Sequence, residues 1–205
     1  MRSMKRLTYI ISTFLILAGM YGGTAATRDQ TGAEKDTNAD CPKSNDRASY
    51  RCYEVRGNTK EQLKTFFKDK RPGGFWARAD WYVSYRYDYE KNRKGGCKVT
   101  RVTVTNECTI EFPVWVRTQD AIYAASNWKK MVLALKNHEE NHCGHGEWLS
   151  REFKKQALKI STLSCRTLKG KVKSKFDSLL SQARNNDQAY DEWTNHGLTE
   201  GVRLE

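Results

Sequence analysis

Hydrophobic and polar residues alternate along the first half of the chain with the period of β-strands. One face of residues 81–89 collects the side chains of Trp81, Val83, Tyr85, Tyr87 and Tyr89. This pattern predicts a strand whose aromatic face packs on helices. β-Branched residues at 97–105 and a second alternation at 108–116 predict further strands, and residues 50–56 predict a short one. Together they suggest an antiparallel meander of three or four strands.

A helical period appears before and after these strands. Leu63, Phe66 and Phe67 predict a helix over residues 59–70, which Pro72, Gly73 and Gly74 should end. Asp120 is a suitable N-cap for a second helix from Ala121, whose apolar stripe consists of Trp128, Met131, Val132 and Leu135. Gly144 and Gly146 should end or distort that helix. Residues 148–163 and 168–186 predict two more helices, and residues 190–197 are turn-like. Because most of the strands are grouped ahead of the long C-terminal helices, the expected class is α+β: a small antiparallel sheet packed against the second helix and the C-terminal helices.

The N-terminus has the order of a secretory signal peptide. Arg2, Lys5 and Arg6 precede an apolar run at 7–20, and small residues end at Ala26. The run is shorter than the roughly 20 residues that span a bilayer, which favours a cleaved signal peptide over a transmembrane anchor. After cleavage, no stable membrane insertion is expected. The predicted organisation is a signal peptide at 1–26, a flexible polar linker at 27–49 and one domain at 50–205. We expect a secreted or periplasmic protein of a Gram-negative cell envelope.

Six cysteines follow the signal peptide, which in an exported chain indicates disulfide bonds. Sequence alone cannot select among the possible pairings. The pairings that we favour are Cys97 with Cys165, Cys41 with Cys52, and Cys108 with Cys143. Cys143 directly follows a histidine, but on a helix it points about 100° away from it, which disfavours metal ligation.

The chain is basic, with a formal net charge of +12. Such a balance favours acidic partners. The lysines and arginines are dispersed along the sequence, however, which favours solvated faces over a dedicated anion site, and no specific nucleic-acid partner is expected.

The predicted second helix carries the sequence His138-Glu139-Glu140-Asn141-His142. Histidines four residues apart share one helix face, so both imidazoles can reach one zinc ion at about 2.0–2.1 Å. Glu139 follows the first histidine, which is the position of the general base in HExxH metalloproteases. Both histidines continue the apolar stripe, where an unpaired polar ring is costly and a ligand would satisfy it.

A catalytic zinc site needs a third protein ligand. His145 lies on the same face but about 10 Å from His138 along an unbroken helix. Glu147 and Glu152 are carboxylate alternatives, although ordinary exposed charges explain both. His196 is the preferred third ligand, because the intervening antiparallel helices can return it to the motif.

Several residues outside the motif occur in an order that is similar to a known family. They are Val55, Arg56 and Gly57, the strand at 81–87, Cys97, Phe112 to Trp115, Trp128, Cys165, Tyr190, Asp191, Thr194, His196 and Gly197. In this order the chain resembles the domain of unknown function 922 family of predicted secreted bacterial zinc-dependent proteases, over residues 50–201. The resemblance implies a zincin-like core, supports His196 as a functional residue and favours the pairing of Cys97 with Cys165.

Three functions compete for this sequence. The first is a metallopeptidase with Zn²⁺ on His138, His142 and His196, Glu139 as base, Tyr190 as donor to the developing oxyanion and Asp191 as a partner of the ligands; its partner is a peptide or protein substrate. An extended substrate would pair with the strand at 108–116. The second is a zinc amidase that acts on cell-wall peptides. The third is a non-catalytic, disulfide-stapled envelope binding protein.

Overall fold

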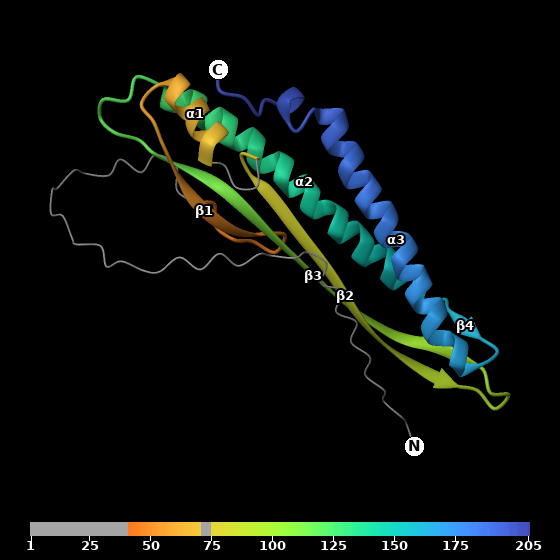
Figure 1. Cartoon of the computed structure of the whole chain (residues 1–205). Helices are drawn as coiled ribbons and strands as arrows, with labels where there is room; N and C mark the ends of the chain where they lie inside the picture. The colour runs from red at the N-terminus through yellow and green to blue at the C-terminus, as the bar shows by residue number, and fades with distance from the viewer. Residues whose placement is uncertain (1–40, 71–74) are drawn as a thin grey trace.

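The computed structural model describes residues 41–70 and 75–205 and consists of a long twisted sheet with helices along it (Figure 1). Predicted features before residue 41, including the signal peptide, and the predicted helix stop at 72–74 lie outside the described residues. The elements in chain order are β1 (Ser49–Arg56), α1 (Lys60–Lys70), β2 (Arg78–Lys91), β3 (Cys97–Val116), α2 (Ala125–Ala157), β4 (Ser161–Thr162), α3 (Cys165–Thr194) and a 3₁₀ turn at Leu198–Glu200. The class is α+β, as predicted.

The sheet is mixed rather than antiparallel. Its order is β1-β3-β2, with β4 paired to β3. β2 and β4 run antiparallel to β3, but β1 runs parallel to it, so the predicted antiparallel meander is wrong in that strand. Residues 97–116 form one strand instead of two, because Asn106 keeps its place in the ladder opposite Val83. Thr109, Ile110 and Glu111 pair on both sides, so this part of β3 has no edge to offer an extended substrate.

The aromatic face of β2 packs against the helices, as its period predicted. Val83 and Tyr85 are buried. The Tyr85 ring lies 4.5 Å from that of Phe153 on α2 and 4.7 Å from that of Phe176 on α3, measured between centroids. These rings belong to a hydrophobic core between β2, β3, the second half of α2 and α3. A second core lies at the other end, where α1, β1 and the start of α2 meet.

α2 is longer than the sequence indicated. It begins at Ala125 rather than Ala121, and it passes through Gly144 and Gly146 without ending. Gly146 is buried against the sheet: a Cβ there would lie 2.5 Å from Asn106 Oδ1 and 3.3 Å from the Trp81 ring. This glycine therefore allows close contact between helix and sheet instead of stopping the helix.

The predicted helices at 148–163 and 168–186 are also corrected. Residues 148–157 complete α2, and α3 continues to Thr194, so Tyr190 and Asp191 are helical rather than turn residues. α2 and α3 are antiparallel neighbours joined by a short connection that contains β4 (Figure 1). The C-terminal part of α3 thereby reaches the middle of α2.

Three disulfides link the elements, with the three pairings favoured from the sequence. Cys97–Cys165 joins β3 to the start of α3, Cys108–Cys143 joins β3 to α2, and Cys41–Cys52 ties residue 41, within the predicted linker, to β1. Such bonds persist in an oxidising extracellular or periplasmic environment. In the described ranges, none of the helices combines the length and the apolar content that a membrane crossing requires.

Candidate metal centre

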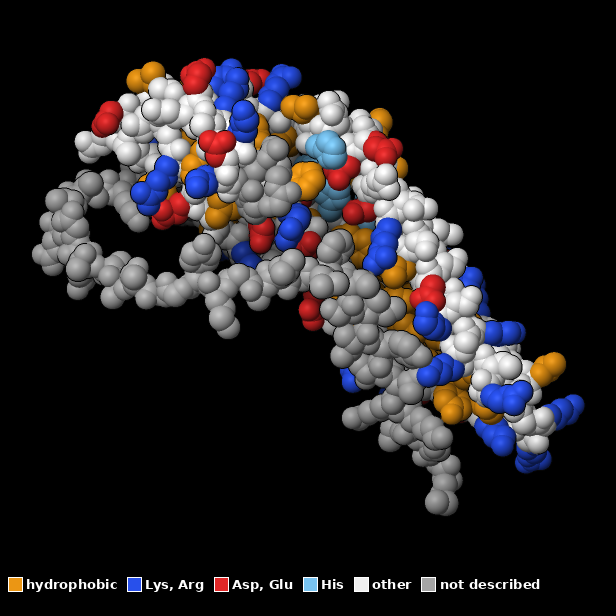
Figure 2. All heavy atoms as spheres, in the orientation of Figure 1, with side chains coloured by type: hydrophobic (Ala, Val, Ile, Leu, Met, Phe, Trp, Pro, Cys, Tyr) orange, Lys and Arg blue, Asp and Glu red, His pale blue; other side chains and the backbone are white. Residues whose placement is uncertain are grey.

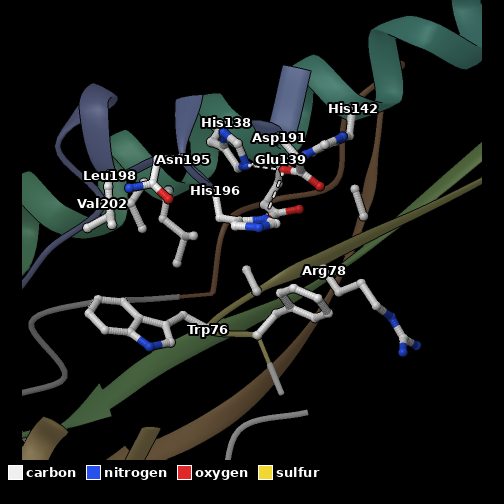
Figure 3. Close-up of a pocket in the computed structure, with 14 residues that line it drawn as sticks. Trp76, Arg78, His138, Glu139, His142, Asp191, Asn195, His196, Leu198 and Val202 are labelled. Carbon is white, nitrogen blue, oxygen red and sulfur yellow. Dashed lines mark hydrogen bonds and ion pairs between the residues drawn. The ribbon is translucent and has the colours of Figure 1, made fainter. Parts of the chain in front are cut away.

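The motif residues lie on α2 between the two cores. His138, Glu139 and His142 are buried, because they continue the apolar stripe of Met131 and Leu135 that faces the sheet. They border a cavity of about 420 Å³ whose other walls come from the start of β2, the end of α3 and the C-terminal segment (Figure 3). Most of these walls are apolar: Phe75, Trp76, Ala77, Ala79, Leu135, Leu198 and Val202.

Three atoms that could bind a metal ion form a compact triangle at the cavity wall. His138 Nε2 lies 3.2 Å from His142 Nε2, and Asp191 Oδ1 lies 3.2 Å from the first and 3.1 Å from the second. Ligand atoms held at about 2.0–2.1 Å by a tetrahedral zinc ion are about 3.3 Å apart. The three edges therefore match one face of a zinc coordination tetrahedron, and His138, His142 and Asp191 could hold a metal ion.

Two further carboxylates fix the imidazole rings from behind. Glu200 Oε2 lies 2.8 Å from His138 Nδ1, and Asp187 Oδ1 lies 2.8 Å from His142 Nδ1. If each Nδ1 donates its proton to its carboxylate, each Nε2 presents a lone pair to the triangle. Asp191 adds only acceptor oxygens, so three acceptors then converge without a proton between them. A bound cation would satisfy all three at once.

The neighbourhood is strongly acidic, which also favours a cation. Burial lowers the pKa of His142, but the hydrogen bond and charge of Asp187, together with Glu139 and Asp191, outweigh burial and raise that pKa. Arg78 is the basic residue of the cavity wall, and Figure 3 shows its guanidinium pointing away from the histidines.

Glu139 is buried in the wall of the same cavity as the triangle. The pKa of its carboxyl is raised to about 7, chiefly by burial: His142 and the Ala79 N–H oppose this rise, and the nearby Asp191 and Asp187 add to it. The Ala79 N–H belongs to β2, so the sheet orients this carboxylate. A carboxyl group with a pKa near neutrality can both accept and return a proton.

The end of α3 turns sharply to close the site. Asn195 and His196 have positive φ angles of 49° and 53°, and Gly197 follows with φ of 80°. A Cβ on Gly197 would lie 2.6 Å from Val202 Cγ2 and 3.2 Å from His138 Cγ, so glycine permits the approach of this turn to the histidine. The turn carries the chain to Glu200, the partner of His138.

His196 lies beside the triangle instead of within it. Its Nδ1 is 3.6 Å from Asp191 Oδ1, its side chain is 61% exposed, and its ring faces the cavity (Figure 3). The sequence therefore located this residue at the site, but its role as third ligand stays a prediction. Asp191, expected only as a partner of the ligands, supplies the third donor atom of the triangle.

Tyr190 packs against the imidazole rings of both motif histidines. Its ring stacks on His138 with centroids 5.0 Å apart, and its hydroxyl donates to Glu200 while accepting from Asn141. Its predicted role as an oxyanion donor stays untested, and these contacts commit its proton elsewhere.

The other ligand alternatives have different partners. His145 Nε2 lies 3.8 Å from Asp187 Oδ1, in a second group with His142, and burial lowers the pKa of its imidazole. Glu147 pairs with Arg47, and Glu152 accepts a hydrogen bond from Gln156.

Sequence reasoning missed Asp187 and Glu200. Asp187 and Asp191 are four residues apart, the same spacing as His138 and His142. Two such pairs on antiparallel helices can face each other, so this spacing was the available signal. Glu200 had no comparable signal, because a single carboxylate near the C-terminus has the same sequence pattern as an ordinary solvent-exposed charge.

The comparisons with known proteins identify a family. The family model described as "Bacterial protein of unknown function (DUF922)" matches residues 50–197, a range that contains the motif and Asp191. No curated protein and no solved structure matches the chain. Since the family model covers more than half of the sequence, this chain belongs to the DUF922 family of bacterial proteins.

Proposed function

We propose that this protein is an exported zinc-dependent peptidase with a zincin-like arrangement of its motif helix. The observation that carries the proposal is the triangle of His138 Nε2, His142 Nε2 and Asp191 Oδ1, with the Glu139 carboxyl in the same cavity. Three protein donors on one side leave an open position for water, which is the arrangement of catalytic rather than structural zinc sites. The three disulfides and the predicted signal peptide support export.

Zn²⁺ bound here would supply Lewis acidity, lowering the pKa of water and polarising a carbonyl group. The chain's own residues supply the proton transfers. Glu139 accepts a proton from the attacking water and delivers it to the departing amine, so the peptide C–N bond breaks as a new C–O bond forms. Its buried position keeps bulk water from competing for that proton.

His196 is better placed than Tyr190 to assist at the substrate carbonyl. Its ring is exposed on the cavity side of Asp191, whereas the Tyr190 hydroxyl is engaged by Asn141 and Glu200. An imidazole N–H directed into the cavity can donate to the oxygen on which negative charge develops. We therefore assign His196 the role of oxyanion donor within this proposal.

The apolar cavity wall indicates the preferred substrate side chain. Phe75, Leu198 and Val202 border the space next to Glu139 and would contact a residue beside the scissile bond. A large apolar side chain buries surface there at about 25 cal/mol per Å². We expect the enzyme to prefer peptides with such a residue on one side of the cleaved bond.

A comparison of two neighbouring glutamates tests the proposal. The full chain, loaded with zinc, is assayed on a peptide library and on peptidoglycan fragments. Glu139→Gln should retain about one zinc per chain and lose 10²- to 10⁴-fold in kcat. Glu140→Gln is the matched control, because Glu140 accepts from Tyr50 and Lys136 on the side that joins α2 to β1. It should remain active.

Two outcomes would reject the peptidase. One is cleavage by Glu139→Gln at the wild-type rate. The other is a folded protein that holds less than half an equivalent of zinc and cleaves no substrate, which would favour a binding protein. Cleavage confined to peptidoglycan fragments would move the proposal from peptidase to cell-wall amidase.

A further inference from the structure

Positive charge is concentrated at the end of the molecule that lies farthest from α1. Residues 91–98, the β2–β3 turn, contain four lysines and arginines, and residues 154–175, the α2–α3 connection with its flanks, contain eight. Neither segment contains an aspartate or a glutamate. We call these two segments together the basic end.

The fold brings the two segments into one surface. Cys97 pairs with Thr162 and Lys98 with Ser161 across the β3–β4 ladder, and the Cys97–Cys165 disulfide fixes the start of α3 to the same place. Ten of the twelve basic residues are exposed, and Lys173 and Lys175 are half-buried. On the face that Figure 2 shows, blue side chains gather at this end of the molecule. The lysines that are dispersed in the sequence are thus gathered in space.

The rest of the described chain has the opposite balance. Outside the basic end, the described residues contain 18 lysines and arginines against 20 aspartates and glutamates. The whole excess of positive charge in the described part therefore lies at one end. Such a separation orients a protein in the field of an anionic surface and speeds its association.

An exposed hydrophobic side chain lies within the basic end. Leu163, between β4 and α3, is 97% exposed, and Leu158 at the end of α2 is exposed beside Lys159. Arg166, Lys171 and Lys175 line a shallow hollow at the same end, together with Ile160 and the hydroxyl groups of Thr167, Ser174 and Ser178. Cations and hydroxyls in one hollow suit phosphate oxygens.

We propose that the basic end docks on the surface of a bilayer that contains anionic phospholipids. Its cations contact the headgroup phosphates, and Leu163 enters the boundary between headgroups and acyl chains. A basic surface with an exposed apolar side chain is the combination that holds peripheral proteins on such membranes. A soluble polyanion such as nucleic acid matches the charge but gives Leu163 no apolar environment.

Docking in this orientation leaves the candidate metal centre accessible. His142 precedes the end of α2 by 15 residues, or about 22 Å of helix, and Asp191 follows the start of α3 by 26 residues, or about 39 Å. The cavity therefore lies on the order of 30 Å from the docked end. Substrates near the membrane, but not within it, would be reached.

Vesicle sedimentation with the mature chain, from which the predicted signal peptide at 1–26 has been removed, tests the docking. We expect binding to vesicles of phosphatidylcholine with 30% phosphatidylglycerol, weakened by high salt, and little binding to phosphatidylcholine alone. Each removed charge should weaken the partition about fivefold, so the triple variant Lys159→Gln, Arg166→Gln, Lys171→Gln should lose about 100-fold. Leu163→Ser should lose about tenfold.

Matched variants at the other end serve as controls. Lys64, Lys129 and Lys130 are exposed on α1 and at the start of α2, and Leu133 is 59% exposed on α2. Their replacement by glutamine and serine respectively should leave binding within about twofold, with far-ultraviolet circular dichroism confirming the fold of every variant. Equal binding to both vesicle types, or equal losses at the two ends, would overturn the proposal. So would binding to duplex DNA as tight as to the anionic vesicles and unaffected by Leu163→Ser.

Discussion

Replacing Asp191 with asparagine separates the two possible ligand sets of the candidate metal centre. Asp191 Oδ1 lies 3.2 Å from His138 Nε2 and 3.1 Å from His142 Nε2, so it is the third corner of the triangle. Asparagine has the same shape but offers a neutral amide oxygen, which is a much weaker zinc ligand than a carboxylate. The change removes a negative charge without changing the packing.

The expected loss follows from the number of ligands. Structural zinc sites with four protein ligands bind with about 10–16 kcal/mol, or about 3 kcal/mol for each ligand. Losing most of one ligand should therefore raise the Kd for zinc by about 10²-fold, since each 1.4 kcal/mol is a factor of ten. His196→Gln should raise it less than tenfold, because the ring of His196 lies outside the triangle and contacts Asp191 only at 3.6 Å.

Competition with a chromophoric zinc chelator measures both variants against the wild type at one pH. The reasoning is refuted if Asp191→Asn binds zinc like the wild type while His196→Gln loses 10²-fold. That result would restore the ligand set of His138, His142 and His196 that the sequence favoured.

Two further changes probe the parts that support the triangle. Glu200→Gln should weaken zinc binding 10- to 100-fold in the same competition assay, because it removes the carboxylate that orients His138, and unchanged affinity would show that this hydrogen bond is dispensable. Gly197→Ala should lower the free energy of unfolding by about 1–3 kcal/mol in urea with chelator present, since its Cβ would meet Val202 at 2.6 Å in a backbone with positive φ. Gly144→Ala is its control: a Cβ there meets nothing within 4 Å, so added helix propensity should stabilise the protein by about 0.5–1 kcal/mol, and equal effects at both glycines would contradict the steric explanation.

Local patterns along the sequence predicted the features that depend on one element at a time. The period of two in 81–89 identified the buried face of β2, and the stripe of Met131, Leu135, His138 and His142 placed both imidazoles toward the interior. The three favoured disulfide pairings were also confirmed, among them Cys97 with Cys165, which the family resemblance supported as well.

The features that depend on contacts between distant elements were missed. Gly146 was predicted to stop the helix, but the structure needs a glycine there because Trp81 and Asn106 pack closely against α2. Those two residues are about 40 to 65 positions away along the chain, so the local sequence gives no sign of them. The parallel direction of β1 is set by the path of the chain through α1 and β2, which no alternation encodes. The carboxylates of Asp187 and Asp191 lie on a polar helix, where a ligand and a solvated charge have the same sequence pattern until α2 and α3 are packed together.

The two attachments of α3 determine under which conditions the chain can complete its candidate site. One end is joined covalently to β3 through Cys97 and Cys165, and the other meets α2 through the acidic side chains around His138 and His142. The first attachment requires an oxidant, and a metal ion bound at the candidate centre would strengthen the second. We therefore expect the site to be complete only after export, the route that the proposed function assumes, because a reducing cytoplasm with little free zinc supplies neither the oxidant nor the ion.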